Sequence, residues 1–238
     1  MNRINTNMRN AMLLAACNLQ KFIDLNWGGT ICGGFPRDMK LRRTPRDIDL
    51  YVSIKDFTQV QNYLRGGSHD MSMDPDIKWK PNGEEGYEHS YVEVCREFEL
   101  CAGLKTLFPA ITHLPINLIG LRWDYNVRAD TDGKSVTDLY NLGLSQAWLN
   151  PDAGSLDDVI ETSELFDRDA GAGRITVLRD TWGIAATKAQ LNKLTGPGAK
   201  YEGYTVYWPN GEPADDISIV EVLGVGPYHT IDNFDNDF

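Results

Sequence analysis

The sequence predicts an α+β fold in which helices flank a mixed β-sheet, with a helical C-terminal part. Three observations support this prediction. Apolar residues recur at helical spacing in residues 6–25 and again from residue 55. Beyond residue 150, helical spacing is more frequent than strand-like alternation. Apolar runs of strand length occupy the first half of the chain at residues 30–33, 47–54, 91–100 and 116–121.

The first predicted helix covers residues 6–25, where apolar side chains return every three or four positions. Thr6 or Asn5 can cap its start, because both side chains carry an oxygen that accepts from a free backbone amide. Asn26 followed by Gly28-Gly29 would end the helix. The glycines then lead into the first strand.

Two shorter helices are expected between the next strands. Pro36 suits the first turn of a helix of about residues 37–41. A further helix begins near Lys55 and closes at Gly66-Gly67. The polar residues 68–90 that follow are rich in Asp, Gly and Pro, which predicts a long loop.

The second half begins with an almost wholly apolar run at residues 116–121, which predicts a central strand.

We expect a core over residues 1–150, a helical accessory part over 151–208 packed on this core, and a C-terminal extension over 209–238 with an acidic tail. The elements expected after the central strand are helices over residues 134–149, 155–167 and 182–194 and strands over 174–178 and 217–225.

The composition predicts an intracellular protein without a membrane span. In 238 residues, 42% of them hydrophobic, no apolar run approaches the length that crosses a bilayer. The apolar patch at residues 11–17 is short and continues in helical rhythm, so we interpret it as part of an amphipathic helix and not as a signal peptide. The four cysteines form no CxxC pair, which suits a reducing compartment. We therefore expect a cytoplasmic location, in the host cytoplasm if the protein is viral.

The charged residues exclude some partners and indicate others. A net charge of −11 argues against non-specific binding of duplex DNA, and the four scattered histidines argue against a zinc site. One segment is nevertheless basic, which suits a triphosphate or an RNA end. Against the single acidic residue Asp38, this segment carries Arg37, Lys40, Arg42, Arg43 and Arg46.

Two aspartates open the second predicted strand. Asp47 and Asp49 are two residues apart, so their side chains project from the same side of a strand, while Ile48 and Leu50 project from the other. Two like charges held together repel each other unless a cation or a proton lies between them. The pair therefore predicts a site for a hard divalent ion, Mg²⁺ or Mn²⁺.

The stretch GGFPRDMKLRRTPRDIDLYV, residues 33–52, resembles the signature of the polymerase-beta-like nucleotidyltransferase superfamily. It is most similar to the head domains of class II CCA-adding enzymes and bacterial poly(A) polymerases. Later segments also resemble small nucleotidyltransferase-like proteins of bacteriophages. The positions that match the superfamily signature are Gly33, Gly34, Arg37, Asp38, Pro45, Asp47, Asp49 and Leu50.

This resemblance implies a nucleotidyltransferase-like fold and a reaction. The enzyme would transfer a nucleoside monophosphate from a nucleoside triphosphate (NTP) to a hydroxyl group of RNA or tRNA, a protein or a small molecule. Asp47 and Asp49 would be the catalytic residues and metal ligands. The implied nucleotide-binding residues are Gly33, Gly34, Arg37, Asp38, Arg42, Arg43 and Arg46.

The third metal ligand departs from the family pattern. The superfamily often supplies another carboxylate from a neighbouring strand, where this chain has Asn117. An amide binds Mg²⁺ less well than a carboxylate does. Glu97 on the strand at residues 91–100 is an alternative candidate, and alternation along that strand does not choose between it and Glu93 or Glu99.

A second hypothesis follows from this departure. The chain would then be a catalytically degenerate protein of the same fold that binds a protein partner through its acidic surface and its tail. A viral origin is part of this hypothesis. The tail, residues 231–238, carries three aspartates and ends in phenylalanine. It resembles the acidic tips of single-stranded DNA-binding proteins, which dock on partners, whereas a frayed acidic terminus is the alternative.

Overall fold

The computed structural model describes residues 3–66, 92–121, 133–178, 184–208 and 213. These residues belong to two compact units. The first unit contains residues 3–66, 92–121, 133–139 and 145–164, and the second contains residues 140–144, 165–178, 184–208 and 213. The division of the chain at residues 150 and 208 that the sequence predicts stays a prediction.

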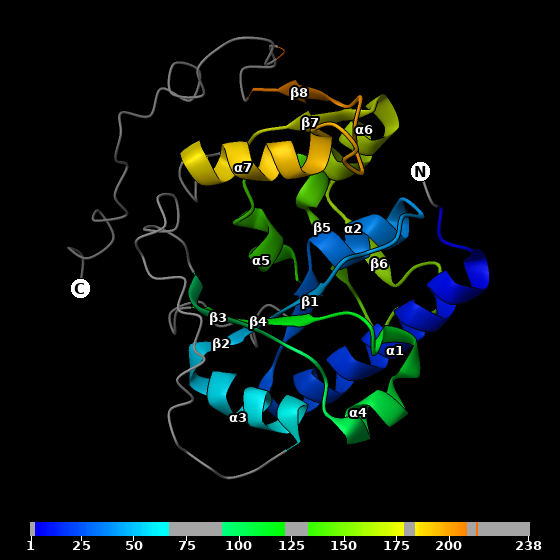
Figure 1. The fold of residues 1–238 in the computed structure, drawn as a ribbon, viewed down its shortest axis with the longest axis vertical. Coiled ribbons are helices and arrows are strands. Elements are labelled where there is room, and N and C mark those ends of the chain that lie inside the picture. Colours follow the sequence, from blue (N-terminus) through cyan, green and yellow to red (C-terminus); the bar gives the residue numbers. More distant parts are fainter. Residues whose placement is uncertain (1–2, 67–91, 122–132, 179–183, 209–212, 214–238) are drawn as a thin grey trace, which may run out of the picture. The chain divides into compact units, whose positions relative to one another are not determined.

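A six-stranded sheet organises the first unit, in the order β3-β4-β2-β1-β5-β6 (Figure 1). β2 and β4 run parallel, and every other neighbouring pair is antiparallel, so the sheet is mixed as predicted. β4 lies between β3 and β2, which confirms that it is an interior strand. The strands are β1 (Thr30–Cys32), β2 (Ile48–Ser53), β3 (Val92–Phe98), β4 (Ile116–Leu121), β5 (Ala147–Leu149) and β6 (Ile160–Thr162).

Helices flank this sheet. The described helices of the first unit are α1 (Thr6–Trp27), α2 (Gly34–Lys40), α3 (Ile54–Arg65), α4 (Ala102–Leu107) and α5 (Lys134–Asp138), with a 3-10 turn η1 (Pro109–Ile111). Asn5 caps α1, because its side chain accepts from the Met8 amide. Gly66 ends α3 in the left-handed conformation that glycine adopts without strain.

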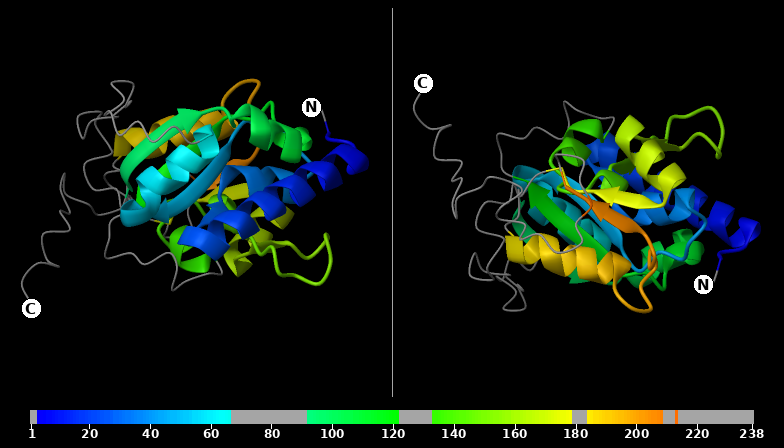
Figure 2. Two further views of the ribbon diagram at one scale, coloured as in Figure 1. Left: turned by 90° about the horizontal axis from the view of Figure 1, so that it is seen from below. Right: turned by 90° about the horizontal axis from the view of Figure 1, so that it is seen from above.

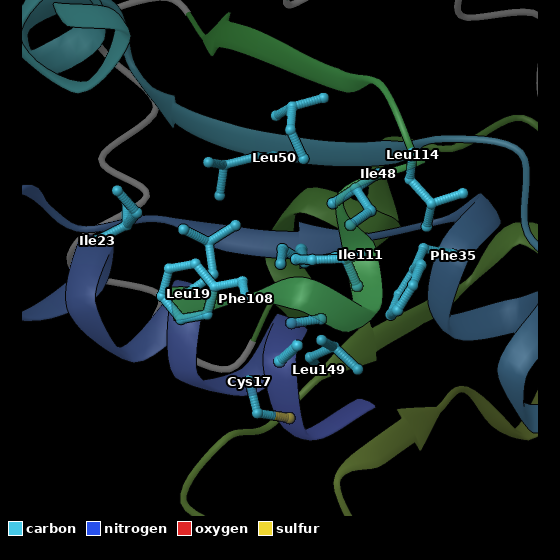
Figure 3. Close-up of a cluster of buried hydrophobic side chains, with 14 of the residues drawn as sticks. Cys17, Leu19, Ile23, Phe35, Ile48, Leu50, Phe108, Ile111, Leu114 and Leu149 are labelled. Carbon is cyan, nitrogen blue, oxygen red and sulfur yellow. The ribbon is translucent and has the colours of Figure 1, made fainter. Parts of the chain in front are cut away.

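The hydrophobic core lies between one face of the sheet and the helices α1 and α3. Alternate strand residues supply its sheet side, among them Ile31, Leu50 and Leu118, all fully buried. Leu19 of α1 and Leu64 of α3 pack against them from the helices. Figure 3 shows Leu19 and Ile23 of α1 directed toward Leu50 and Phe108, and Figure 2 shows α1 and α3 on the same side of the strands. The opposite face of the sheet therefore carries the strand residues that alternate with these core residues, including Asp49.

The second unit contains the parallel pair β7 (Arg174–Thr176) and β8 (Thr205–Tyr207), with α6 (Glu164–Ala172), α7 (Ile184–Thr195) and the 3-10 turn η2 (Gly143–Ser145). Asp169 of α6 is fully buried and fixes β7. Its carboxylate accepts from the Thr176 amide at 2.7 Å, from the Thr176 hydroxyl at 2.8 Å and from Nε of Arg174 at 3.0 Å. These bonds compensate for the burial of the charge.

The predicted helix over residues 134–149 is wrong beyond its first turns. α5 ends at Asp138, and Ala147–Leu149 forms β5, which pairs with β1 and β6. All three residues of β5 are buried, and a strand between two others satisfies their backbone groups inside the sheet. Tertiary pairing therefore overrides the helical spacing of this segment.

The predicted helix over residues 155–167 is also wrong in its first half. Ser155 donates to the carboxylate of Asp158 at 2.6 Å within a turn, and Ile160–Thr162 forms the edge strand β6. The helix α6 begins only at Glu164. The hydrogen bond from the Ser155 hydroxyl to Asp158 closes a turn and does not start a helix.

The remaining differences concern boundaries. α2 begins at Gly34 and not at residue 37, and α4 and η1 were not predicted. The predicted loop 68–90, the strand 217–225, and the start of the helix 182–194 lie outside the described residues. None of the helices in the described ranges is long and apolar enough to cross a membrane.

Candidate functional site

One row of paired residues crosses the whole sheet. Residues that pair between neighbouring strands project from the same face, so these side chains share the face opposite to the core of α1 and α3. Asp49 lies near the middle of this row. Following the strands from β3 to β6, the row contains Glu97, Asn117, Asp49, Cys32, Trp148 and Glu161.

The two aspartates and Arg37 converge in front of Gly34. A Cβ atom added to Gly34 would lie 3.8 Å from Oδ2 of Asp49, 3.9 Å from Oδ1 of Asp47 and 3.7 Å from Nη2 of Arg37. Both aspartates are partly exposed. The structure therefore brings together four of the residues that the sequence predicts, from the start of α2 and the start of β2.

Arg37 is held in place by its neighbour on α2. Its Nε donates to Oδ1 of Asp38 at 2.9 Å, and the side chains of Arg37 and Asp38 are only 10% and 2% exposed. Because the guanidinium group is planar and rigid, this bond also directs Nη2 toward Gly34. Asp38 thus lies behind the site and orients the arginine that lies in it.

Asn117 contacts Asp49 directly. Its Nδ2 donates to Oδ1 of Asp49 at 2.9 Å, while Oδ2 of the same carboxylate is the atom near Gly34. Glu97 pairs with Asn117 and is exposed. Two strand spacings separate Glu97 from Asp49, roughly 9–10 Å along the sheet. Of the two candidates for a third ligand, Asn117 is therefore the neighbour of the aspartates.

Gly33 connects β1 to α2 in a conformation that requires glycine, with φ 78° and ψ −118°. Its amide donates to the Ala147 carbonyl at 2.7 Å, and its carbonyl accepts from the Arg37 amide at 3.0 Å. The Gly33 amide is therefore already engaged with β5. Of the two glycines, Gly34 is the one whose open side faces Asp47, Asp49 and Arg37.

The basic segment does not stay together in the structure. Arg37 lies at the aspartates, whereas Arg42 donates from Nη1 to the Thr6 hydroxyl at 3.4 Å and Arg43 forms a β-bridge with Arg3. Arg46 is exposed next to Asp47 in the sequence. The described contacts thus place Arg42 and Arg43 at the N-terminal segment, because the backbone at Arg42 turns the chain back toward residues 3–6.

Gly133 covers the row beside Asp49, and sequence reasoning missed it. With φ 69°, it lies against β1 and β5, where an added Cβ would be 2.8 Å from both Oγ1 of Thr30 and Cβ of Trp148. Its carbonyl also contacts Sγ of Cys32 at 3.8 Å. The signal was the Asp132-Gly133 dipeptide, which marks a turn. Its contact with Trp148 could not be expected from the sequence, because residues 147–149 were predicted to be helical and form the strand β5.

The residues of this site fit a hard divalent cation in their chemistry. Two carboxylates with an amide side chain beside them supply oxygen atoms, the donors that Mg²⁺ and Mn²⁺ prefer. Among the residues that the structure describes, no group of three His, Cys, Asp or Glu side chains is placed to hold a metal ion. Asp47 and Asp49 with Asn117 therefore make up the candidate donor set.

Comparison with known proteins gives similarity to solved structures only. No family model matches the chain, and no curated protein matches it. The Thermotoga maritima CCA-adding enzyme complexed with tRNA is 17% identical with a TM-score of 0.46, covering 86% of this chain and 40% of the enzyme. A CCA-adding enzyme with CTP is 18% identical with a TM-score of 0.46, covering 80% of this chain and 38% of the enzyme.

A third solved structure, a CCA-adding enzyme with ATP, is 19% identical with a TM-score of 0.43 and covers 74% of this chain and 35% of the enzyme. This chain thus spans well under half the length of the enzymes that it matches. The chain is thus similar, at low identity, to part of each of these CCA-adding enzymes.

Proposed function

We propose that this protein is a metal-dependent nucleotidyltransferase that transfers a nucleoside monophosphate from an NTP to a hydroxyl acceptor. The observation that carries the proposal is the convergence of Asp47, Asp49 and Arg37 on the open side of Gly34. Carboxylates, a guanidinium group and a glycine at one point suit a triphosphate with its counter-ion. The sequence signature of residues 33–52 supports the same assignment.

Asp47 and Asp49 would hold the divalent cation. When bound, such a cation lowers the pKa of an attacking hydroxyl group and neutralises phosphate charge. Asn117 keeps Oδ1 of Asp49 occupied through its hydrogen bond, which leaves Oδ2 directed toward Gly34. The geometry of the chain's own residues therefore presents one oxygen of each aspartate to the same space.

Arg37 would neutralise charge on the triphosphate. Its buried ion pair with Asp38 holds the side chain in one conformation, so little entropy is lost when a phosphate binds. The absence of a side chain at Gly34 allows a phosphate to approach the backbone closely. We retain Arg46 in this group, because it precedes Asp47 and is exposed, and we leave out Arg42 and Arg43, which contact residues 3–6.

In the proposed reaction, the acceptor hydroxyl gives its proton to water, and its oxygen forms a bond with the α-phosphorus. The bond between this phosphorus and the bridging oxygen of the β-phosphate breaks, and pyrophosphate leaves with the negative charge. Arg37 is placed to stabilise this charge. The acceptor would be a hydroxyl group of RNA or tRNA, of a protein, or of a small molecule.

The test is a transfer assay with α-labelled NTPs, Mg²⁺ or Mn²⁺, and RNA, protein and small-molecule acceptors. Asp47→Asn/Asp49→Asn keeps the size of both side chains and removes their charge, so it should abolish label transfer. Asp152→Asn is a matched control, since this aspartate is exposed and lies outside the site. Equal labelling by the wild type and the double variant would refute the assignment.

A second candidate function rests on the identity of residue 117. Asparagine stands beside Asp49 where the superfamily pattern has a carboxylate, which favours a protein that keeps the fold and has lost the reaction. Such a protein would act through a partner that binds its acidic tail, residues 231–238. Two measurements distinguish the candidates. Metal-dependent binding of an NTP in calorimetric titration supports the enzyme. Binding of a protein partner that is lost when the tail is deleted supports the alternative.

A further inference from the structure

Arginines gather where the start of α1 meets the chain between α2 and β2. Arg3 and Arg43 form an antiparallel β-bridge. The Ile4 amide donates to the Arg42 carbonyl at 3.2 Å, and Nη1 of Arg42 donates to the Thr6 hydroxyl at 3.4 Å. Two short segments that are far apart in the sequence are thus fastened together, and each brings arginines to the junction.

Arg9 adds a further positive charge from the next turn of α1. Its side chain is 9% exposed, its Nε donates to the Met39 carbonyl at 2.9 Å, and its Nη1 lies 3.7 Å from the exposed carboxylate of Asp157. Burial lowers the pKa of Arg9, Asp157 raises it, and the nearby charge of Arg42 lowers it again. Arg9 and Arg42 are therefore close enough to repel each other. We call Arg3, Arg9, Arg42 and Arg43 the arginine surface.

The backbone of Arg42 is in a conformation that favours glycine. Its φ is 55°, the one positive φ of a non-glycine residue in the described ranges. Arg42 follows the end of α2, where the Arg43 amide donates to the Asp38 carbonyl at 2.7 Å, a position at which helices usually have glycine. Arginine adopts this backbone conformation less readily than glycine does. The backbone at this position therefore does not explain an arginine, and its guanidinium group, which donates to Thr6, is the part to consider.

The surroundings of the arginine surface favour an anion. The first turn of α1 contains no acidic residue, and its helix dipole adds partial positive charge at this end. An open hollow of about 500 Å³ lies there, lined by Asn5, Thr6, Asn7 and Met8, whose side chains include amide and hydroxyl groups. The protein has a net charge of −11, so these arginines form a basic surface on an otherwise acidic protein.

We propose that the arginine surface binds the phosphodiester backbone of a single-stranded RNA. Guanidinium groups donate two parallel hydrogen bonds to a phosphate, which lysine does not do, and every cation of this surface is an arginine. The overall negative charge disfavours tracking along a duplex, whereas a short basic surface is enough to hold one strand. The choice of RNA as the ligand rests on the proposed function, in which an RNA hydroxyl is one acceptor. The inference that the arginine surface binds an anion does not rest on that function.

The test compares Arg42→Gly with the wild type in binding a short unstructured RNA, measured by fluorescence anisotropy over a range of salt concentrations. We expect roughly five-fold weaker binding at low salt and a salt dependence that is reduced by about 0.7 in the slope of log K against log salt. Because glycine relieves the strain at this position, the unfolding temperature should stay equal or rise. A loss of binding with a gain of stability separates a role in RNA binding from a structural role.

Arg168→Ala is the matched control, since Arg168 is an exposed arginine on α6 in the other unit. An equal loss of RNA binding in both variants would show that binding depends on net charge and not on the arginine surface. This result would overturn the proposal. Binding of poly-glutamate as tight as that of RNA at the same salt would also overturn it, in favour of an acidic protein partner. RNA binding by a wild-type protein that transfers label to none of the acceptors would reject the proposed function and still support the arginine surface.

Discussion

Asn117 donates from Nδ2 to Oδ1 of Asp49 at 2.9 Å, across the parallel pair of β4 and β2. The other oxygen of Asp49, Oδ2, lies near the open side of Gly34, close to Asp47 and Arg37. The two oxygens of this carboxylate therefore face different neighbours: Oδ1 accepts from the neighbouring strand, and Oδ2 faces Gly34. This division leads to the first prediction.

Replacing Asn117 with Asp should increase the affinity for Mg²⁺ and reduce the stability of the metal-free protein. Three carboxylates would then face one another, and their repulsion raises the free energy of the folded state by about 1–3 kcal/mol without a cation. Added Mg²⁺ should raise the unfolding temperature of Asn117→Asp more than that of the wild type. A metal-independent unfolding temperature in this variant would contradict the placement of a cation site here.

Replacing Gly34 with Ala should weaken NTP binding without unfolding the protein. An added Cβ meets its neighbours at 3.7–3.9 Å, which is ordinary van der Waals contact, and alanine in the first turn of α2 is at least as favourable as glycine. The methyl group would nevertheless occupy the space that Asp47, Asp49 and Arg37 share. Calorimetry should show several-fold weaker NTP binding with an unchanged unfolding temperature. A loss of stability instead would point to a structural role for Gly34.

Replacing Asp38 with Asn should destabilise the protein by roughly 3 kcal/mol, because the buried charge of Arg37 would lose its partner. NTP affinity should fall as well, since Arg37 would no longer be oriented toward Gly34. Chemical denaturation measures the first effect and calorimetry the second. The exposed pair of Lys105 and Glu99 is the comparison: Glu99→Gln should leave the unfolding free energy almost unchanged, although Lys105 lowers the pKa of Glu99 through its hydrogen bond.

Replacing Gly133 with Ala should destabilise the protein by about 2–4 kcal/mol. An alanine there combines an unfavourable positive φ with contacts of 2.8 Å to Thr30 and Trp148. Gly173 is a control with a similar φ of 64° and open space around it, so Gly173→Ala should cost only about 1 kcal/mol of backbone strain. Equal losses in the two variants, measured by urea denaturation, would show that Gly133 does not pack against the sheet.

The thiol of Cys17 should resist alkylation at pH 8 in the folded protein. Burial raises the pKa of Cys17 to about 11, against a smaller lowering by Lys21, so the reactive thiolate is scarce. Because the folded pKa exceeds the unfolded one, Cys17 contributes full stability below about pH 9 and loses it as the pH rises toward 11. Cys17→Ala should remove this part of the alkaline destabilisation, which denaturation at several pH values would show. Alkylation of Cys17 as fast as in unfolded protein would contradict its burial.

The elements that sequence analysis predicted well are those with a strong local signal. α1 is capped by Asn5, one of the two caps that residue type allowed, and it ends at the predicted Gly28. β4 was recognised as interior because its residues are almost all apolar. β5 and β6 were missed, since three-residue strands carry too little periodicity and are stabilised by pairing with distant residues.

What the sequence alone determined about the site is the direction of its side chains. The two-residue period of an extended chain directs Asp47, just before β2, and Asp49, in β2, to the same side, and the positive φ at residue 33 is reserved for glycine. These properties are local, so they follow from neighbouring residues.

Only the tertiary structure decided which distant residues share the site. The strand order places Asn117 beside Asp49 and Glu97 one strand further away, and the turn at Arg42 sends Arg42 and Arg43 toward residues 3–6 while Arg37 remains with the aspartates. Both outcomes depend on pairing between segments that are far apart in the chain. The free energy that stabilises this pairing comes from burial and hydrogen bonds across the whole sheet, so it cannot be predicted from a local sequence pattern.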